Sequence, residues 1–218
     1  MYQPPHFEIR DQRLLHGLIR SWPLGLLITA DADDVSANPL PFILLEDDSG
    51  PRLQCHMARA NTQWQAIEAG APVKLVFSGP NHYISPNWYP SKAEHGRAVP
   101  TWNYASVQAQ GDVSIHHDSS WLRRHTAALS LEQEKHIQDK SQLPPKQRPK
   151  PWTLDEAPEP FIEAQLRAIV GLEMKNLQLK GKFKLSQNRS ADDRAQVIAN
   201  LRTLEPMAKN LADLMDHS

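Results

Sequence analysis

Four short segments of this 218-residue sequence gather side chains that could bind a ligand: cations, amides, hydroxyls and aromatic rings. They cover residues 56–61, 83–89, 99–104 and 181–189. Cationic side chains and helix N-termini attract anions such as phosphate, and aromatic rings stack on planar ligands. Together these groups would suit a ligand that joins a phosphate to a planar ring system.

The first segment runs from the end of an expected strand into the start of an expected helix. Unpaired backbone N–H groups and the helix dipole favour an anion at such a place. Arg59 and Asn61 lie there and could bind a phosphate. The alternative is that Asn61 only caps the helix and Arg59 is a solvated surface residue.

The second segment brings three aromatic side chains and the hydroxyl of Ser85 together within a few residues. These side chains could form a planar wall for a ring system. A loop that is held in place by aromatic packing alone would have the same sequence.

The third segment has the alternation of a strand. Thr101 and Asn103 point to one face, whereas Trp102 and Tyr104 point to the other. One face would then offer hydrogen bonds and the other a stacking surface. Alternatively, Trp102 and Tyr104 fill the core of a barrel, and the two polar residues lie on its surface.

The fourth segment carries a row of lysines. Lys180, Lys182 and Lys184 alternate along one face of an expected strand, with Phe183 and Leu185 on the other. Such a row suits an anion or an acidic partner. It would equally protect an edge strand from pairing with other chains.

Several other chemistries are not favoured by the sequence. It contains no Gly-rich phosphate loop and no Gly-x-Ser-x-Gly nucleophile motif. His116 and His117 are adjacent on an expected strand and point to opposite faces, so we expect no metal site there. The single Cys55 excludes an intramolecular disulfide. It shares the apolar face of its strand with Leu53 and Met57, which predicts a core position.

Charge and hydropathy narrow the partners and the compartment. The formal net charge of −1 creates no basic field for nucleic acid or a membrane. Arg123-Arg124 and the basic stretch 146–150 are the nearest approach to a DNA-binding footprint. The longest apolar runs, such as Leu24 to Ala30, are far too short to span a membrane. No signal peptide follows Met1, so we expect a cytoplasmic protein.

The elements that must position these segments predict an α+β fold. Residues 24–110 read as about five strands with short loops and one helix, which is typical of a closed or nearly closed antiparallel barrel. One strand, Ser36–Leu45, contains Pro39 and Pro41. Because proline cannot donate to a ladder, this strand should be bulged or lie at an edge.

Further elements follow from periodicity and turn signals. We expect strands at 72–78, interrupted by Gly79-Pro80 and resuming at 83–85, at 99–110, and at 168–185 with a bulge near Lys175-Asn176. We expect helices at 10–21, 61–69, 121–138 with Ser119 or Ser120 as the cap, and 161–166, and another capped by Ser190 with Asp193. The whole chain, 1–218, is expected to be one domain: 1–118 holds the main barrel strands, and 119–218 a helical excursion, the last barrel strand and C-terminal helices.

These segments resemble the PaiB family of FMN-binding negative transcriptional regulators. The matching stretches are Met1-Tyr2, Pro4-Pro5-His6-Phe7, 37–42, 56–61 with Gln63-Trp64, Gly79-Pro80, 83–86, Trp88-Tyr89, 99–104, 181–189 and Asp193-Arg194. The resemblance implies a split β-barrel related to flavin reductases and pyridoxamine phosphate oxidases. It also implies a homodimer with flavin sites in the cleft between subunits. Gln108 and Gln110 depart from the family pattern.

The resemblance implies FMN rather than FAD and suggests roles for particular residues. Arg59 and Asn61 would hold the phosphate, and Trp102 would pack against the flavin. The other expected cofactor-binding residues are Asn38, His56, Ser85, Thr101, Asn103, Lys184, Gln187 and Asn188. Two alternatives stay open: a flavin-dependent oxidoreductase, and a cofactor-free interaction protein with DNA among its partners.

Overall fold

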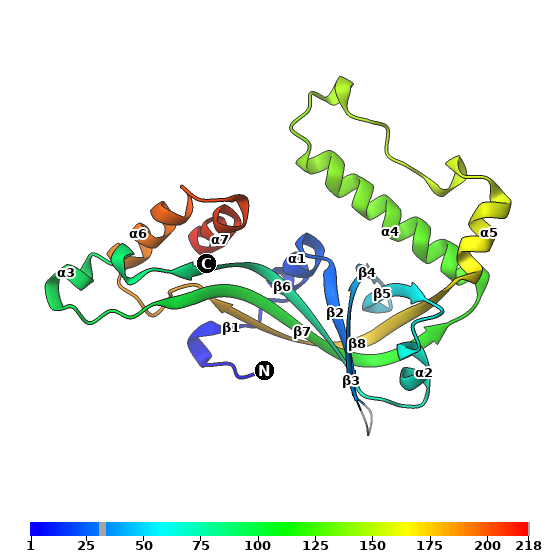
Figure 1. Ribbon diagram of the computed structural model, residues 1–218, viewed down its shortest axis with the longest axis horizontal. Coiled ribbons are helices and arrows are strands. Elements are labelled where there is room, and N and C mark those ends of the chain that lie inside the picture. Colours follow the sequence, from blue (N-terminus) through cyan, green and yellow to red (C-terminus); the bar gives the residue numbers. More distant parts are fainter. Residues whose placement is uncertain (31–33, 218) are drawn as a thin grey trace. The chain divides into compact units, whose positions relative to one another are not determined.

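The computed structural model describes residues 1–30 and 34–217. Its strands are β1 (Glu8–Ile9), β2 (Leu24–Ala30), β3 (Val35–Pro41), β4 (Ile43–Asp47), β5 (Gly50–Ala58), β6 (Val73–Ile84), β7 (Thr101–His116) and β8 (Ile169–Lys184). Its α-helices are α1 (Gln12–Ser21), α2 (Gln63–Glu68), α3 (Ser91–His95), α4 (Ser119–Lys140), α5 (Glu159–Arg167), α6 (Ala191–Leu201) and α7 (Pro206–Asp216). Figure 1 shows the long neighbouring strands β6, β7 and β8. The predicted α+β class with a large antiparallel sheet is confirmed.

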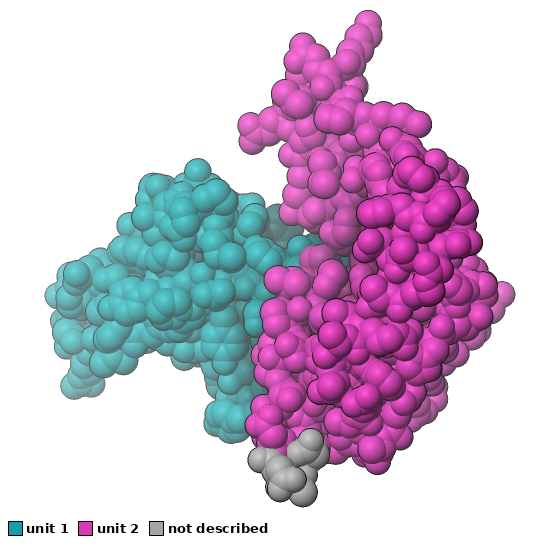
Figure 2. Space-filling model, turned by 45° about the vertical axis from the view of Figure 1, so that its right-hand side comes forward, with its two compact units in different colours: residues 1–22, 76–109, 179–218 teal, residues 23–75, 110–178 magenta. Residues whose placement is uncertain are grey.

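The chain forms two compact units, which Figure 2 shows in different colours. Unit 1 comprises residues 1–22, 76–109 and 179–218, and unit 2 comprises residues 23–75 and 110–178. The strands β6, β7 and β8 contribute residues to both units. The sheet has the strand order β3-β2-β6-β7-β8-β5-β4, and β1 pairs with β8. The expectation of a single domain stays a prediction.

The proline-containing strand lies at an edge, as predicted, but it is shorter than expected. The stretch predicted as one strand is two: β3 pairs with β2, and β4 pairs with β5. Phe42 lies between them with a buried ring, and its N–H donates to the carbonyl of Pro23 at 2.9 Å. Burial of this ring therefore ends one strand and redirects the chain into the next.

The strand β6 is continuous, so the predicted break at Gly79-Pro80 is wrong. Glycine is needed inside this strand because its neighbours approach closely. A Cβ at position 79 would lie 2.9 Å from Leu18 Cδ1 and 3.3 Å from the carbonyl oxygen of Ala105. The pair therefore marks a close packing contact rather than a turn.

The predicted bulge near Lys175-Asn176 has a clear counterpart in β8. Asn176 adopts a left-handed φ of 50°, and its amide donates to Asp112 Oδ2 at 2.6 Å. The carbonyl of Lys175 lies so close to β7 that a Cβ at Gly111 would be 2.2 Å from its oxygen. Glycine accommodates this contact, and β7 continues beyond its predicted end at Gln110.

Helix caps agree only partly with the sequence prediction. Asp118 caps α4 by accepting from the Trp121 N–H at 2.7 Å. The predicted caps Ser119 and Ser120 are wrong, because both already lie inside the helix. An extended acidic residue just before the first turn is a strong cap and also favours the helix dipole.

Ser190 caps α6 as predicted and accepts from the Asp193 N–H at 3.2 Å. The carboxylate of Asp193 does not complete a capping box in the hydrogen bonds of the described residues. It accepts from the N–H of Ser91 at 3.1 Å and from its hydroxyl at 2.7 Å. The residue therefore ties α6 to the start of α3 within unit 1.

Each unit has its own buried apolar side chains. In unit 2 the predicted core face of β5, Leu53, Cys55 and Met57, is buried against β8. Burial also raises the pKa of the Cys55 thiol. The largest buried side chains of unit 1 include Phe77, Phe183, Leu15 and Ile19. Across residues 1–30 and 34–217, every helix is too short or too polar to cross a membrane.

We predict that Gly171→Ala destabilises the protein. A Cβ at this position of β8 would lie 2.1 Å from Cζ3 of the Trp121 ring, so overpacking should cost about 1–3 kcal/mol of unfolding free energy. The control is Gly17→Ala in α1, where a Cβ would have no neighbour within 4 Å and should be neutral or stabilising by up to about 1 kcal/mol. Urea unfolding of both variants measures this, and wild-type stability of Gly171→Ala would contradict it.

Candidate functional site

The structure divides the expected site residues between the two units. Unit 2 contains Asn38, His56, Arg59 and Asn61. Unit 1 contains Ser85, Thr101, Trp102, Asn103, Lys184, Gln187 and Asn188.

Arg59 is anchored at the end of β5. Its guanidinium donates from Nε to the carbonyl of Arg167 at 3.0 Å and from Nη2 to the carbonyl of Ile169 at 2.9 Å. Its Nη1 lies 3.2 Å from Nδ1 of His117. A guanidinium has more N–H groups than these contacts use. The side chain is half-buried and fixed, and it keeps donors for an anion.

Asn38 and Asn61 are joined through a residue that the sequence did not single out. The buried Gln63 accepts from the Asn38 amide at 3.0 Å, and its own N–H donates to Oδ1 of Asn61 at 3.1 Å. Its side-chain amide also donates to the carbonyl of Leu27 at 3.2 Å and the hydroxyl of Thr29 at 3.1 Å. Gln63, the first residue of the six-residue helix α2, thus holds the side chains of Asn38 and Asn61 in place.

His56 belongs to a buried chain of polar side chains. Its Nδ1 lies 3.0 Å from Nε2 of His125, and Nδ1 of His125 lies 3.3 Å from Oε1 of Gln54. The Gln54 amide then donates to Oε2 of Glu173 at 2.7 Å. Because side chains alternate along a strand, the sequence places Gln54 and His56 on one face of β5. It gave no signal for His125, which comes from α4, or for Glu173, which comes from β8.

Aromatic rings stack against one side of this chain. Trp121 lies between His116, at 4.1 Å between centroids and 5° between planes, and His125, at 5.2 Å and 17°. The neighbouring His117 turns away, and its Nε2 lies 2.9 Å from the carboxylate of Glu68. The two histidines therefore have different partners, as the strand alternation predicted. In the part of the chain that the structure describes, no three metal-ligating side chains converge.

Burial keeps these imidazoles neutral. It lowers the pKa of His56, and it lowers the pKa of His125 to about 3, with the neighbouring histidines adding to the effect. Burial also lowers the pKa of His116. For Glu173 burial opposes ionisation, but hydrogen bonds from Lys175 and Gln54 outweigh it and lower the pKa. The chain therefore runs from a carboxylate to neutral rings.

In unit 1 the structure decides which face of β7 is buried. Asn103 is fully buried and donates to the hydroxyl of Ser186 at 2.8 Å, whereas Trp102 is 51% exposed. The alternative with Trp102 as a core residue is therefore wrong. The Trp102 indole donates to Asn81 at 3.1 Å and meets the exposed Tyr83 edge to face. Oδ1 of Asn103 is buried and has no hydrogen-bond partner among residues 1–30 and 34–217.

In the lysine row of β8, the pairing with β1 covers only Gly181 and Lys182, so the edge-protection alternative stays open. In unit 1 β8 has β1 and β7 as neighbours, and Lys182 lies opposite Glu8. Lys182 Nζ lies 5.6 Å from the centroid of the Tyr104 ring. Lys184 donates to the hydroxyl of Thr101, and burial lowers its pKa.

The remaining expected residues of unit 1 have local structural roles or an open surface position. Ser85 accepts from the Asn87 N–H at 3.2 Å and so starts a 3₁₀ turn. Gln187 accepts from the Leu185 N–H and donates to the Phe183 carbonyl, both at 2.7 Å. Asn188 is exposed. The binding roles of both groups of site residues stay predictions.

Comparisons with known proteins show the family. The family model described as "Putative FMN-binding domain" matches residues 1–176. The "Protease synthase and sporulation protein PAI 2" of Bacillus subtilis is 30% identical over 217 residues, which cover 99% of this chain and 97% of that protein.

Two solved structures show the fold. A FAD and heme binding protein of Mycobacterium smegmatis has a TM-score of 0.56 at 15% identity, covering 86% of this chain and 78% of that one. A conserved hypothetical protein of Mycobacterium tuberculosis has a TM-score of 0.55 at 9% identity, covering 87% and 94%. With the antiparallel sheet, these likenesses confirm the predicted split-barrel fold class.

We predict that the free energy of unfolding decreases as the pH is lowered, because of the buried histidines. His125 stays neutral in the folded state down to about pH 3, whereas in the unfolded chain it takes up a proton near pH 6.5. As the pH drops below 6.5 the unfolded state binds more protons, so the unfolding free energy should fall by up to about 1.4 kcal/mol per pH unit for this group. Urea unfolding at several pH values between 6.5 and 4.5 should show that the unfolding free energy decreases more steeply with falling pH in the wild type than in His125→Asn. Parallel slopes would contradict the assignment.

Proposed function

Since the chain belongs to the FMN-binding-domain family, we propose that it binds FMN as a homodimer and acts as a PaiB-like negative transcriptional regulator. The observation that carries the proposal is the family match over residues 1–176. This range contains every expected cofactor-binding residue except Lys184, Gln187 and Asn188. A cytoplasmic location is part of the proposal.

The chemistry of Arg59 fits the FMN phosphate. The two carbonyls of Arg167 and Ile169 fix its guanidinium in place, and unused N–H groups remain for an anion. A fixed guanidinium loses little entropy when it binds a phosphate oxygen. Asn61 lies two residues further on, and Gln63 and Asn38 support it. We therefore assign the phosphate to Arg59 with Asn61.

The side chains of unit 1 fit the flavin ring, whichever subunit of a dimer supplies them. Trp102 and Tyr83 are exposed aromatic rings that could stack on isoalloxazine. Asn103 is fully buried on the opposite face of β7 and donates to the hydroxyl of Ser186, so in this proposal it supports the strand that carries Trp102. Bound FMN would supply a redox-active ring. The roles of Thr101 and Lys184, like those of His56, Ser85, Gln187 and Asn188, are part of the same proposal.

Regulation is proposed from the relative rather than from a DNA-reading element. The chain aligns with the sporulation protein PAI 2 over almost its whole length. In the basic stretch 146–150 the guanidinium of Arg148 has a structural role. Arg148 donates to the carbonyls of Gln138, Ser141 and Leu143 at 2.8–3.2 Å and so ends α4 instead. Such a regulator would respond either to the redox state of its bound flavin or to the supply of FMN, which sets how much of the protein has FMN bound.

We predict that the protein binds FMN more tightly than riboflavin, and that Arg59→Gln removes the difference. The two ligands differ only in the phosphate, so their affinity ratio reports the phosphate contact directly. Loss of charge-assisted hydrogen bonds of about 1.5–3 kcal/mol predicts an affinity loss for FMN of about ten-fold or more. Quenching of flavin fluorescence measures both affinities.

Trp102→Ala is the matched control for this titration. It should weaken FMN and riboflavin by the same factor, because stacking acts on the ring that both share. Arg59→Lys should keep part of the preference for FMN. A wild-type protein that binds neither ligand at tens of micromolar would contradict the proposed function, as would an unchanged ligand ratio in Arg59→Gln.

We also predict regulation rather than turnover. The protein should sediment as a dimer at micromolar concentration, because a groove on the outer wall of a barrel shelters a ligand well only when a second surface closes over it. It should shift DNA from its own promoter in moderate salt, where purely electrostatic binding is lost. Protein-dependent and FMN-dependent oxidation of NAD(P)H, without DNA binding, would favour the oxidoreductase alternative instead.

A further inference from the structure

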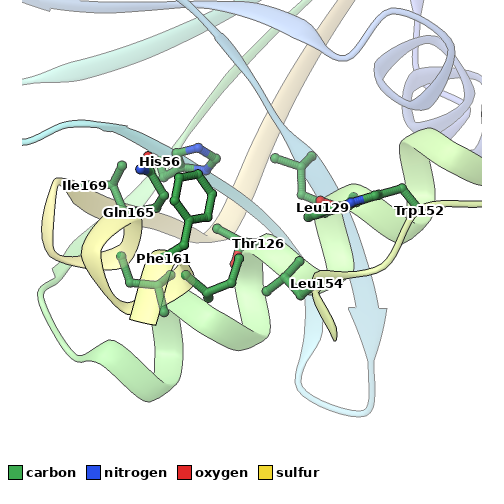
Figure 3. A pocket seen from close by; sticks show the side chains of 11 residues that line it. His56, Thr126, Leu129, Trp152, Leu154, Phe161, Gln165 and Ile169 are labelled. Carbon is green, nitrogen blue, oxygen red and sulfur yellow. The ribbon is translucent and has the colours of Figure 1, made fainter. Parts of the chain in front are cut away.

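Unit 2 contains a pocket of about 350 Å³ that none of the features above explains. α4, α5 and the segment between them form most of its wall, and β5 contributes His56 (Figure 3). Its volume lies within the range of roughly 300–1,000 Å³ that is usual for small-molecule sites. The pocket is therefore large enough for a one-ring or fused two-ring molecule.

The wall of the pocket is mainly apolar and aromatic, and its polar members besides His56 are the uncharged Thr126, Ser130 and Gln165. Leu129, Ile162 and Leu166 form its buried part. The rings of Trp152 and Phe161 also line it, although they are 40% and 55% exposed. Among the described residues that line the pocket, none carries a carboxylate, ammonium or guanidinium group. Such a wall favours an uncharged aromatic ligand over an ion.

The buried polar chain fixes what His56 presents to this pocket. Gln54 donates its amide to Glu173, so its carbonyl oxygen faces His125 and must accept from Nδ1–H of that ring. The neutral His125 then has an unprotonated Nε2, which must accept from Nδ1–H of His56. Because His56 is also neutral, its own Nε2 is left as a hydrogen-bond acceptor.

The hydrogen-bond geometry of the polar chain sets the tautomers of His125 and His56. Each step follows from the single role that a neighbouring group can take: a carboxylate accepts, and an amide donates from nitrogen and accepts at oxygen. Burial of His56 and His125, which lowers both pKa values, agrees with the neutral rings that the chain requires. The anchoring of Glu173 by Lys175 at 2.9 Å and Arg52 at 3.4 Å keeps the far end of the chain charged.

We propose that this pocket binds a small, uncharged aromatic molecule whose N–H or O–H group donates to Nε2 of His56. Trp152 and Phe161 would hold its ring, and the buried leucines and isoleucine would exclude water. This inference goes beyond the FMN proposal, because the pocket residues other than His56 have no part in that proposal. A second ligand of this kind suits an effector of a regulatory protein.

The test uses indole and 1-methylindole, which differ in the one N–H group that His56 should recognise. Isothermal titration or saturation-transfer NMR on the full-length protein should show that indole binds at least ten-fold more tightly than 1-methylindole. In His56→Leu the two probes should bind equally. Binding of both should be lost in Leu129→Trp, in which the new ring fills the pocket.

Leu131→Trp is the control for that substitution, because Leu131 lies on the same helix with its side chain 63% exposed. It should leave indole binding unchanged, and its unfolding midpoint shows whether α4 tolerates a tryptophan. Absence of indole binding at millimolar concentration would overturn the inference, as would equal affinities in the wild type or retained binding in Leu129→Trp. Failure of FMN to bind leaves the indole result intact, so the failure of this inference and that of the FMN proposal are distinguishable.

Discussion

The antiparallel pairing of β5 with β8 is the constraint on which the rest of unit 2 depends. Its register places Gln54 opposite Glu173 and His56 opposite Gly171. A slip by one residue would turn these polar groups to the other face and expose the Cys55 face. The same pairing brings Arg59, just beyond β5, to the carbonyls of Arg167 and Ile169. One strand pair thus fixes both the proposed phosphate ligand and the polar chain.

The electrostatics of unit 2 follow from this arrangement. Glu173 is a buried carboxylate, which is costly unless donors surround it. Its partners are Gln54, Lys175 and Arg52, and the orientation of Gln54 then determines the tautomer of His125. Stacking of the His125 ring on Trp121 requires a glycine beneath it at position 171. The polar chain of side chains therefore has its negative charge at Glu173 and neutral imidazole rings at its other end.

The sequence predicts well the features that depend on local pattern. Strand alternation separated the buried Cys55 face of β5 from the face of His56, and the change of phase in β8 predicted the irregularity at Asn176. Ser190 was recognisable as a cap because capping involves only neighbouring residues. Edge position of the proline-containing β3 followed from the missing N–H groups.

Features that depend on distant partners could not be predicted in the same way. His125 contacts His56 although the two residues are 69 positions apart in the sequence, and the residues around each give no signal of this contact. The burial of Asn103 and the exposure of Trp102 reverse the usual preference of these residue types. Gly79-Pro80 resembles a turn signal but marks tight packing within a strand. Tertiary contacts override local propensity at each of these positions.

We propose above that Arg59, held by two main-chain carbonyls, binds the phosphate of FMN. A crystal structure of the protein grown with FMN tests this most directly, because it locates the phosphate relative to both groups of expected residues. We expect a phosphate oxygen within hydrogen-bond distance of the Arg59 guanidinium. A phosphate bound at the Lys184 side chain, or anywhere away from Arg59, would contradict it.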